Sequence, residues 1–101
     1  MRDTKSDGVK EDKSKKARWD LMDWSALNMA AEVMALGCGI HKDDAGWKNK
    51  SINEHFASCQ RHLVAYFTGE KYDLVTGKHH LSHALCRVMF MLALELEGTR
   101  E

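Results

Sequence analysis

Histidines spaced about one helical turn apart are the residues in this sequence best suited to chemistry. His80 and His83 are three residues apart, so on a helix they would lie on one face, with Arg87 one turn further along. Imidazole binds divalent metal ions and exchanges protons near neutral pH. The pair could therefore chelate a metal or take part in acid–base chemistry, although a partly exposed or hydrogen-bonded histidine is the commoner meaning of such a spacing.

A second group of candidates precedes this pair. One predicted helix face carries His55, Cys59 and His62, and the segment that follows contributes the carboxylates of Glu70 and Asp73. Histidines gathered with carboxylates could form a site for a divalent cation. The spacing matches no zinc-finger pattern, and phosphate-loop, dinucleotide-binding, nucleophile-elbow and HExxH motifs are absent.

Glu32 and Trp47 each allow two interpretations. Glu32 could direct a carboxylate at a metal ion within a helical bundle, or it could face solvent beside Asn28. Trp47 could stack on a nucleotide base, or it could fill a hydrophobic hole, which is the more usual role of a tryptophan.

Helices must position all these residues. The chain has no proline, and Ala, Leu, Met, Glu and Lys dominate the part that is expected to fold. We therefore predict an all-α fold, a small bundle of about three main helices. The first should begin at the capping residue Asp23 and weaken at Gly37 and Gly39, with a polar loop over residues 40–50.

The second helix has the clearest start signal in the chain. Ser51 and Glu54 form a capping box, and Gly69 is suitably placed to end the helix. Thr76 can cap a third helix, which we predict to run over residues 77–97.

The third helix is apolar on nearly every side. From Ala84 to Leu96 only Arg87 and Glu95 are charged. A helix this apolar in so small a domain needs burial on most sides, which predicts that a second copy of the chain covers it in a homodimer.

Composition limits the class of protein. Fifteen basic residues balance fifteen acidic ones, so there is no broad positive field and no direct DNA binding is expected. Residues 1–16 are almost all charged or small and predict a disordered leader, with the folded domain at 17–101. No apolar signal sequence or membrane span is evident, so we expect a cytoplasmic protein in which Cys38, Cys59 and Cys86 are buried thiols.

Three blocks of sequence resemble a known family. Residues 16–27 (KARWDLMDWSAL) are similar to "K-P-R-W-D-L-L-P-W-E-A-L", and residues 39–47 (GIHKDDAGW) are similar to "G-A-K-K-Y-G-x-x-N-W". Residues 61–86 resemble "R-H-L-x-A-W-x-x-G-E-x-x-D-x-x-S/T-G-x-x-H-L-x-H-A". These patterns are those of phage dATP/dGTP diphosphohydrolase N-terminal domains, which belong to the all-α nucleotide pyrophosphohydrolases.

The resemblance implies cleavage of a purine deoxynucleoside triphosphate to the monophosphate and pyrophosphate, with Mg²⁺ or Mn²⁺ as cofactor, in the host cytoplasm if the protein is phage-encoded. The implied metal ligands are Glu32, Glu70, Asp73, His80 and His83. The implied catalytic residues are Glu70, Asp73 and His62. The implied contacts to substrate are made by Lys42, Trp47 and Arg61.

The sequence also departs from the wider superfamily. An E-x-x-E motif is absent, and His80 and His83 occupy the positions of a second acidic pair. Imidazole is a poorer ligand than oxygen for Mg²⁺, so such a site would favour Mn²⁺ or another transition metal, or its histidines would contact phosphates. Two alternatives stay open: a non-catalytic nucleotide-binding or adaptor module, and a histidine-based structural metal or pH-sensing dimer.

Overall fold

The computed structural model describes residues 16–41 and 45–99. Three α-helices carry this part of the chain: α1 (Trp24–His41), α2 (Ile52–Phe67) and α3 (His80–Thr99). Two short 3-10 helices, η2 (Trp19–Leu21) and η3 (Gly46–Asn49), precede α1 and α2. The described residues form no strand, only an isolated bridge between Tyr72 and His79. The prediction of a small all-α bundle is confirmed.

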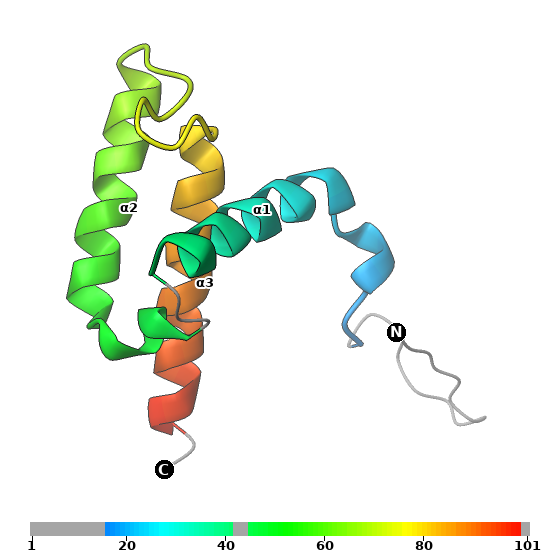
Figure 1. Ribbon diagram of the computed structural model, residues 1–101. Coiled ribbons are helices and arrows are strands. Elements are labelled where there is room, and N and C mark those ends of the chain that lie inside the picture. Colours follow the sequence, from blue (N-terminus) through cyan, green and yellow to red (C-terminus); the bar gives the residue numbers. More distant parts are fainter. Residues whose placement is uncertain (1–15, 42–44, 100–101) are drawn as a thin grey trace.

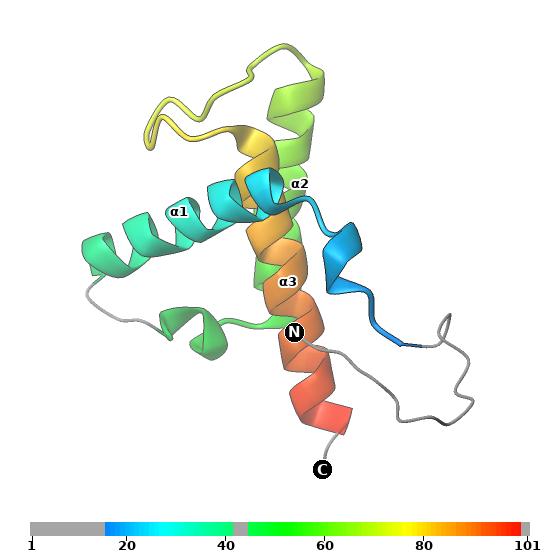
Figure 2. The same cartoon turned by 90° about the vertical axis from the view of Figure 1, so that its right-hand side faces the viewer.

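Helix α3 is the centre of the arrangement. It runs beside α2 over most of its length, and α1 lies across its other side (Figure 1). The view turned by 90° shows α1 crossing α3, with the connector 68–79 at one end of the α2–α3 hairpin (Figure 2). The hairpin therefore holds the histidines of both helices on neighbouring surfaces.

Side-chain caps fix the starts of the first two helices. The Oδ1 atom of Asp23 accepts a hydrogen bond from the Ala26 backbone N–H at 3.1 Å. At α2, the Ser51 hydroxyl accepts from the Glu54 backbone N–H, and the Glu54 carboxylate accepts from the Ser51 N–H. Both predicted caps are confirmed, because each satisfies a backbone donor that the helix itself leaves without a partner.

Two predicted boundaries were wrong. Helix α1 continues through Gly37 and Gly39 to His41. Helix α3 begins at His80 and not at residue 77. The Thr76 hydroxyl accepts from the Lys78 N–H within the connector, and Gly77 has a φ of +74°, which is outside the helical region.

The core of the described chain is thin. Ala30 of α1 packs with Cys86 and Phe90 of α3, and the Cys86 thiol donates to the Ala30 carbonyl at 3.2 Å. Burial raises the pKa of the Cys86 thiol to about 11, so this group behaves as a buried apolar side chain. Cys59 is also buried, whereas Cys38 is only partly buried, so the prediction of three buried thiols holds for two of them.

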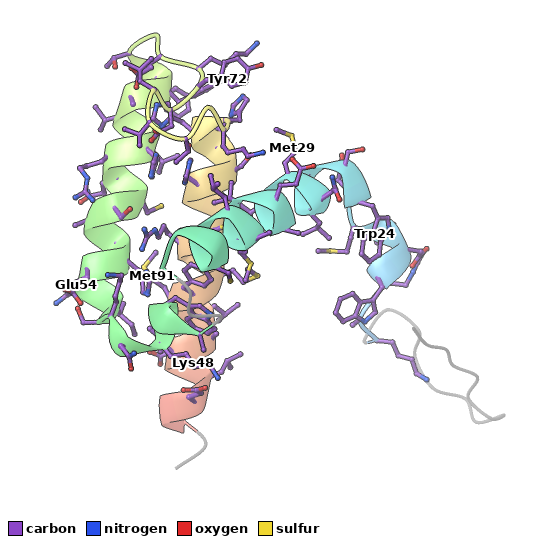
Figure 3. The ribbon with its side chains drawn as sticks, in the orientation of Figure 1. Trp24, Met29, Lys48, Glu54, Tyr72 and Met91 are labelled. Carbon is purple, nitrogen blue, oxygen red and sulfur yellow. The ribbon has the colours of Figure 1, made fainter. Side chains whose placement is uncertain are left out.

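Large apolar side chains remain on the surface around this core. Trp19, Leu21, Met22 and Trp24 are all exposed, and Figure 3 shows Trp24 at the end of α1 that projects away from the hairpin. None of the helices in residues 16–41 and 45–99 combines the length and the apolar character that crossing a membrane requires. Lys42 and residues 1–15 of the predicted leader lie outside the described residues.

Candidate metal centre

Three side chains from three segments meet at the connector end of the hairpin. His62 lies in α2, Asp73 in the connector and His80 at the start of α3. One potential ligand atom from each lies within 4.8 Å of the other two. The Nδ1 atoms of His62 and His80 are 2.8 Å apart, and Asp73 Oδ2 is 3.8 Å from His62 Nδ1. Small side-chain rotations would bring all three within reach of a single cation.

Glu70 sets the proton position of His80. Its Oε1 atom accepts a hydrogen bond from His80 Nε2 at 2.7 Å, and the His80 side chain is almost fully buried. Because Nε2 carries the donated proton, Nδ1 of His80 has the lone pair in this tautomer and accepts the hydrogen bond from His62 Nδ1, 2.8 Å away. Carboxylates hold metal-binding histidines in the same way in known centres. In this geometry Glu70 supports a candidate ligand and is not one of the three converging groups.

The two carboxylate oxygens of Asp73 have different partners. Oδ1 accepts from the backbone N–H groups of Val75 and Thr76, at 2.7 and 3.0 Å, and so fixes the turn. Burial alone would raise the pKa of Asp73, but these two hydrogen bonds bring it below its usual value. The group is therefore a carboxylate at neutral pH, with Oδ2 directed at the histidines.

His83, one turn after His80 on α3, packs against the ring of His62. Their rings stack with centroids 4.3 Å apart, and His83 Nε2 lies 2.8 Å from the Thr76 hydroxyl. Burial is the main cause that lowers the pKa of His62 from 6.5 to about 4, and His83 and His80 lower it further. Burial also lowers the pKa of His83, against the opposing effect of Asp73. Both rings are neutral at pH 7, the form that binds metals.

The chemistry of the three candidate ligands indicates which metal ion would fit. Two neutral imidazoles and one carboxylate suit Mn²⁺ and other transition metals, whereas Mg²⁺ prefers oxygen ligands. The residues at this site therefore fit a divalent transition metal better than they fit Mg²⁺.

Two other predicted residues lie away from the converging atoms. Glu32 is on α1, where its carboxylate accepts from the Asn28 side chain at 3.2 Å and lies 3.7 Å from Lys78 Nζ. Trp47 stacks on Phe90, with ring centroids 4.7 Å apart. Phe90 follows His83 by seven residues, or about 10 Å along α3, so Trp47 packs against the core and not beside the histidines of the candidate centre.

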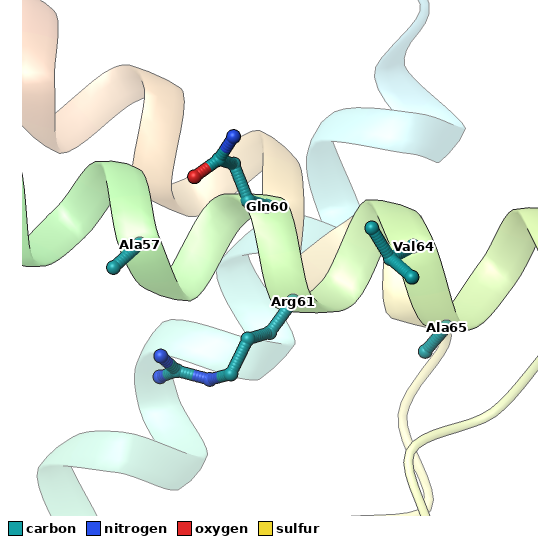
Figure 4. Close-up of a pocket in the computed structure, with 5 residues that line it drawn as sticks. All are labelled: Ala57, Gln60, Arg61, Val64 and Ala65. Carbon is teal, nitrogen blue, oxygen red and sulfur yellow. The ribbon is translucent and has the colours of Figure 1, made fainter.

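Arg61 lies on the exposed side of α2. It lines a shallow surface hollow together with neighbours within about one turn on the same helix. Figure 4 shows its long side chain extended from α2 on the opposite side from Gln60, in a hollow lined by Ala57, Gln60, Arg61, Val64 and Ala65. Its guanidinium is thus available to solvent next to the helix that carries His62.

His55, which shares a helix face with His62, serves the core. Its side chain is fully buried, and its Nε2 atom donates to the Trp47 carbonyl at 2.9 Å. Nδ1 lies 2.9 Å from Arg87 Nη1, and an arginine can only donate. Both ring nitrogens therefore have partners, so the spacing of His55 and His62 indicated a common face but not a common role.

The sequence did not predict the contacts that Thr76 and Arg87 make with histidines. Thr76 was expected to cap a helix, but its hydroxyl contacts His83. Arg87 was noted only as the next turn after His83, whereas its contact with His55 ties α3 to α2. The i, i+3, i+7 spacing of His80, His83 and Arg87 was the available signal for a shared polar face.

Comparison with known proteins agrees with this arrangement of motifs. No curated protein and no solved structure matches the chain. The sequence model of the family described as dATP/dGTP diphosphohydrolase, N-terminal, matches residues 6–101, which include α1, α2, α3 and the connector. The chain belongs to the dATP/dGTP diphosphohydrolase N-terminal domain family.

Proposed function

We propose that this protein hydrolyses a purine deoxynucleoside triphosphate, dATP or dGTP, to the monophosphate and pyrophosphate with a divalent cation bound at the connector end of the hairpin. The observation that carries the proposal is the convergence of His62, Asp73 and His80 within 4.8 Å in a chain of this family. Such a donor set has a direct chemical use in phosphoryl transfer, where charge on the phosphates must be neutralised.

Each residue of the centre has a separate task in this proposal. His80 Nδ1 and Asp73 Oδ2 would hold the cation together with His62, whose Nδ1 would become a ligand once the proton that it donates to His80 in the metal-free protein has moved to Nε2. Glu70 keeps the proton of His80 on Nε2, so that Nδ1 stays available. A bound divalent cation would neutralise the phosphate chain and make a water molecule a better nucleophile at neutral pH.

His83 positions the centre and does not hold the ion. Its stacking against His62 restricts the rotation of that ring, and the Thr76 hydroxyl restricts its own. This differs from the role that the family resemblance implies, in which His83 is a ligand. Glu32 is likewise better placed to hold Lys78 near the start of α3 than to reach the cation.

The protein should act as a homodimer, formed through the surface of the α2–α3 hairpin. The exposed apolar residues of α3 recur at i, i+4, i+7, i+8 and i+11, which places them on one stripe: Leu81, Leu85, Val88, Met89 and Leu92. A matching stripe on α2 consists of Ile52, Phe56, Leu63 and Phe67. Two such stripes on a helical hairpin can pair with their own copies to give a four-helix bundle with a thicker core.

The test is pyrophosphate release from each of the four deoxynucleoside triphosphates, with Mg²⁺ or Mn²⁺ added to metal-free protein. We expect release that requires metal, is faster with Mn²⁺ and prefers purines. Asp73→Asn should reduce the rate by about a hundredfold or more, since it removes a charged ligand. Glu97→Gln is the matched control, because this exposed carboxylate lies near Lys48 at the far end of α3.

Two results would redirect the proposal. A folded protein that releases no pyrophosphate under any condition but binds dGTP would be a nucleotide-binding module. A protein whose dimerisation changes between pH 5 and pH 7 without any effect of nucleotide would be a histidine-based assembly switch.

A further inference from the structure

We propose that Arg87 and Arg61 form an anion site, next to the metal centre, that binds the phosphate chain of the substrate. The identity of the anion as a nucleotide polyphosphate depends on the function proposed above, but the existence of the anion site does not. The site would take a pyrophosphate or longer group, whose charge is spread over several phosphates.

The Arg87 guanidinium is anchored but not neutralised. It is partly buried, and its Nη1 atom donates to His55 Nδ1 at 2.9 Å. His55 is a neutral acceptor, because its other nitrogen donates to the Trp47 carbonyl. Within residues 16–41 and 45–99, no carboxylate lies within 4.0 Å of Arg87. A guanidinium has five N–H donors, so this contact leaves most of them for an anion.

The surroundings of Arg87 concentrate positive charge. Burial lowers the pKa of Arg87, and the charge of Arg61 on α2 lowers it further, which means that the two guanidinium groups repel each other. Arg87 also contributes to the lowered pKa values of His62 and His83, after the larger effect of burial. A partly buried cation without a counter-charge is costly, and a bound anion would remove both that cost and the repulsion.

The position of Arg87 along α3 connects this charge to the metal centre. It follows His83 by four residues, or about 6 Å along the helix axis, on the face that also carries His80. Arg61 directly precedes His62 on α2 and is exposed. The two helices therefore place Arg87 one turn beyond His83 and Arg61 in the turn of α2 that carries His62. A phosphate chain could contact a cation at one end and the arginines at the other.

Arginine suits this task better than lysine would. Its planar fork can donate two parallel hydrogen bonds to one phosphate group, and it keeps its charge when partly buried. The contact with His55 holds the plane of the Arg87 fork in place before any ligand binds, which lowers the entropy cost of binding.

The experiment is calorimetric titration of the full chain with inorganic pyrophosphate, in the presence of a chelator so that no metal contributes. We expect binding that weakens as salt concentration rises. Arg87→Gln and Arg61→Gln should each weaken binding by about tenfold or more, and Arg87→Lys should weaken it less than Arg87→Gln. Arg18→Gln is the matched control, because Arg18 is exposed and already paired with Asp20 at 2.8 Å.

Thermal unfolding of each variant separates loss of binding from loss of the fold. Arg61 is exposed, so Arg61→Gln should keep the wild-type melting temperature even if Arg87→Gln does not. Failure of metal-free wild-type protein to bind pyrophosphate would overturn the anion site, as would unchanged affinity in Arg61→Gln and Arg87→Gln.

Failure of the hydrolase proposal would look different. Arginine-dependent pyrophosphate binding in a protein that hydrolyses no nucleotide would support the anion site and reject the enzyme. Hydrolysis whose KM is the same in wild type, Arg61→Gln and Arg87→Gln would support the enzyme and reject the anion site.

Discussion

The imidazole rings of His62 and His83 lie face to face, with their centroids 4.3 Å apart and their planes within 4° of parallel. Two protonated rings could not share this geometry without strong repulsion. The stack therefore ties the α2–α3 contact to the protonation state of its histidines.

This relationship predicts that the metal-free protein loses stability in acid. The pKa of His62 is about 4 in the folded chain and near 6.5 when unfolded, so between these values the unfolded chain takes up a proton that the folded chain excludes. The stabilisation is complete above about pH 6.5 and falls as pH decreases toward 4. The loss from this residue should be up to about 3 kcal/mol in the free energy of unfolding.

Urea unfolding at several pH values measures that slope, and His62→Gln should flatten it. An NMR titration of the His62 ring gives an independent check. A midpoint near 6.5 in the folded protein would contradict the buried neutral stack.

The contact between Glu70 and His80 predicts that removing the charge of Glu70 weakens Mn²⁺ binding less than removing the charge of Asp73. In Glu70→Gln the side chain keeps its length, but it can accept only a neutral hydrogen bond from His80 Nε2. We expect Mn²⁺ affinity to fall by about tenfold, whereas Asp73→Asn, which changes a ligand, should reduce it far more. Titration of both variants with Mn²⁺, with Glu97→Gln as control, makes the comparison. Equal loss in Glu70→Gln and Asp73→Asn would mean that Glu70 binds the ion directly.

The apolar stripe on α3 predicts a dimer that one charge can disrupt. Leu92→Glu places a carboxylate within the apolar stripe of the proposed interface, and the protein should become a monomer of lower stability. Leu74→Glu is the matched control, because Leu74 lies in the connector, outside the stripe, and is 86% exposed. Light scattering or sedimentation gives the mass of each. If wild type and Leu92→Glu have the same mass, this face is not the interface.

The capping box at the start of α2 predicts a modest and local loss of stability. Ser51→Ala removes the acceptor of the Glu54 N–H, and should cost about 1 kcal/mol in the free energy of unfolding. Ser25→Ala, at an exposed position in the first turn of α1, should change it by less than about 0.5 kcal/mol. Denaturant unfolding of both variants is sufficient, and equal effects would argue against the box.

Local signals predicted the helices well because they act over a few residues. The caps formed by Asp23 and by Ser51 with Glu54 need only short-range hydrogen bonds, and both are present. The start of α3 was missed because Thr76 is a good capping residue by type, yet its hydroxyl is used by His83 and by the turn at Gly77. Hydrogen bonds within the connector and to His83 outweighed the preference of threonine for a helix N-cap.

The sequence indicated which residues are candidates for the site, but it did not indicate how their side chains are arranged. His62, Asp73 and His80 were all among the candidates, but sequence spacing cannot say which ring nitrogen faces which neighbour. It also could not separate His55, which is buried in the core, from His62 on the same helix face. The stacking of Trp47 on Phe90 joins residues 43 positions apart, which no local pattern reveals.

The connector also has a consequence for how the protein folds. The converging side chains all fall between His62 and His80, within one continuous hairpin of the chain. Contacts that are close in sequence form early, because little loop entropy is lost in closing them. The α2–α3 hairpin can therefore assemble the centre before α1 docks, and a cation bound at the proposed centre would stabilise the hairpin. Docking of α1 through Ala30 and Cys86 then completes the domain as a later step.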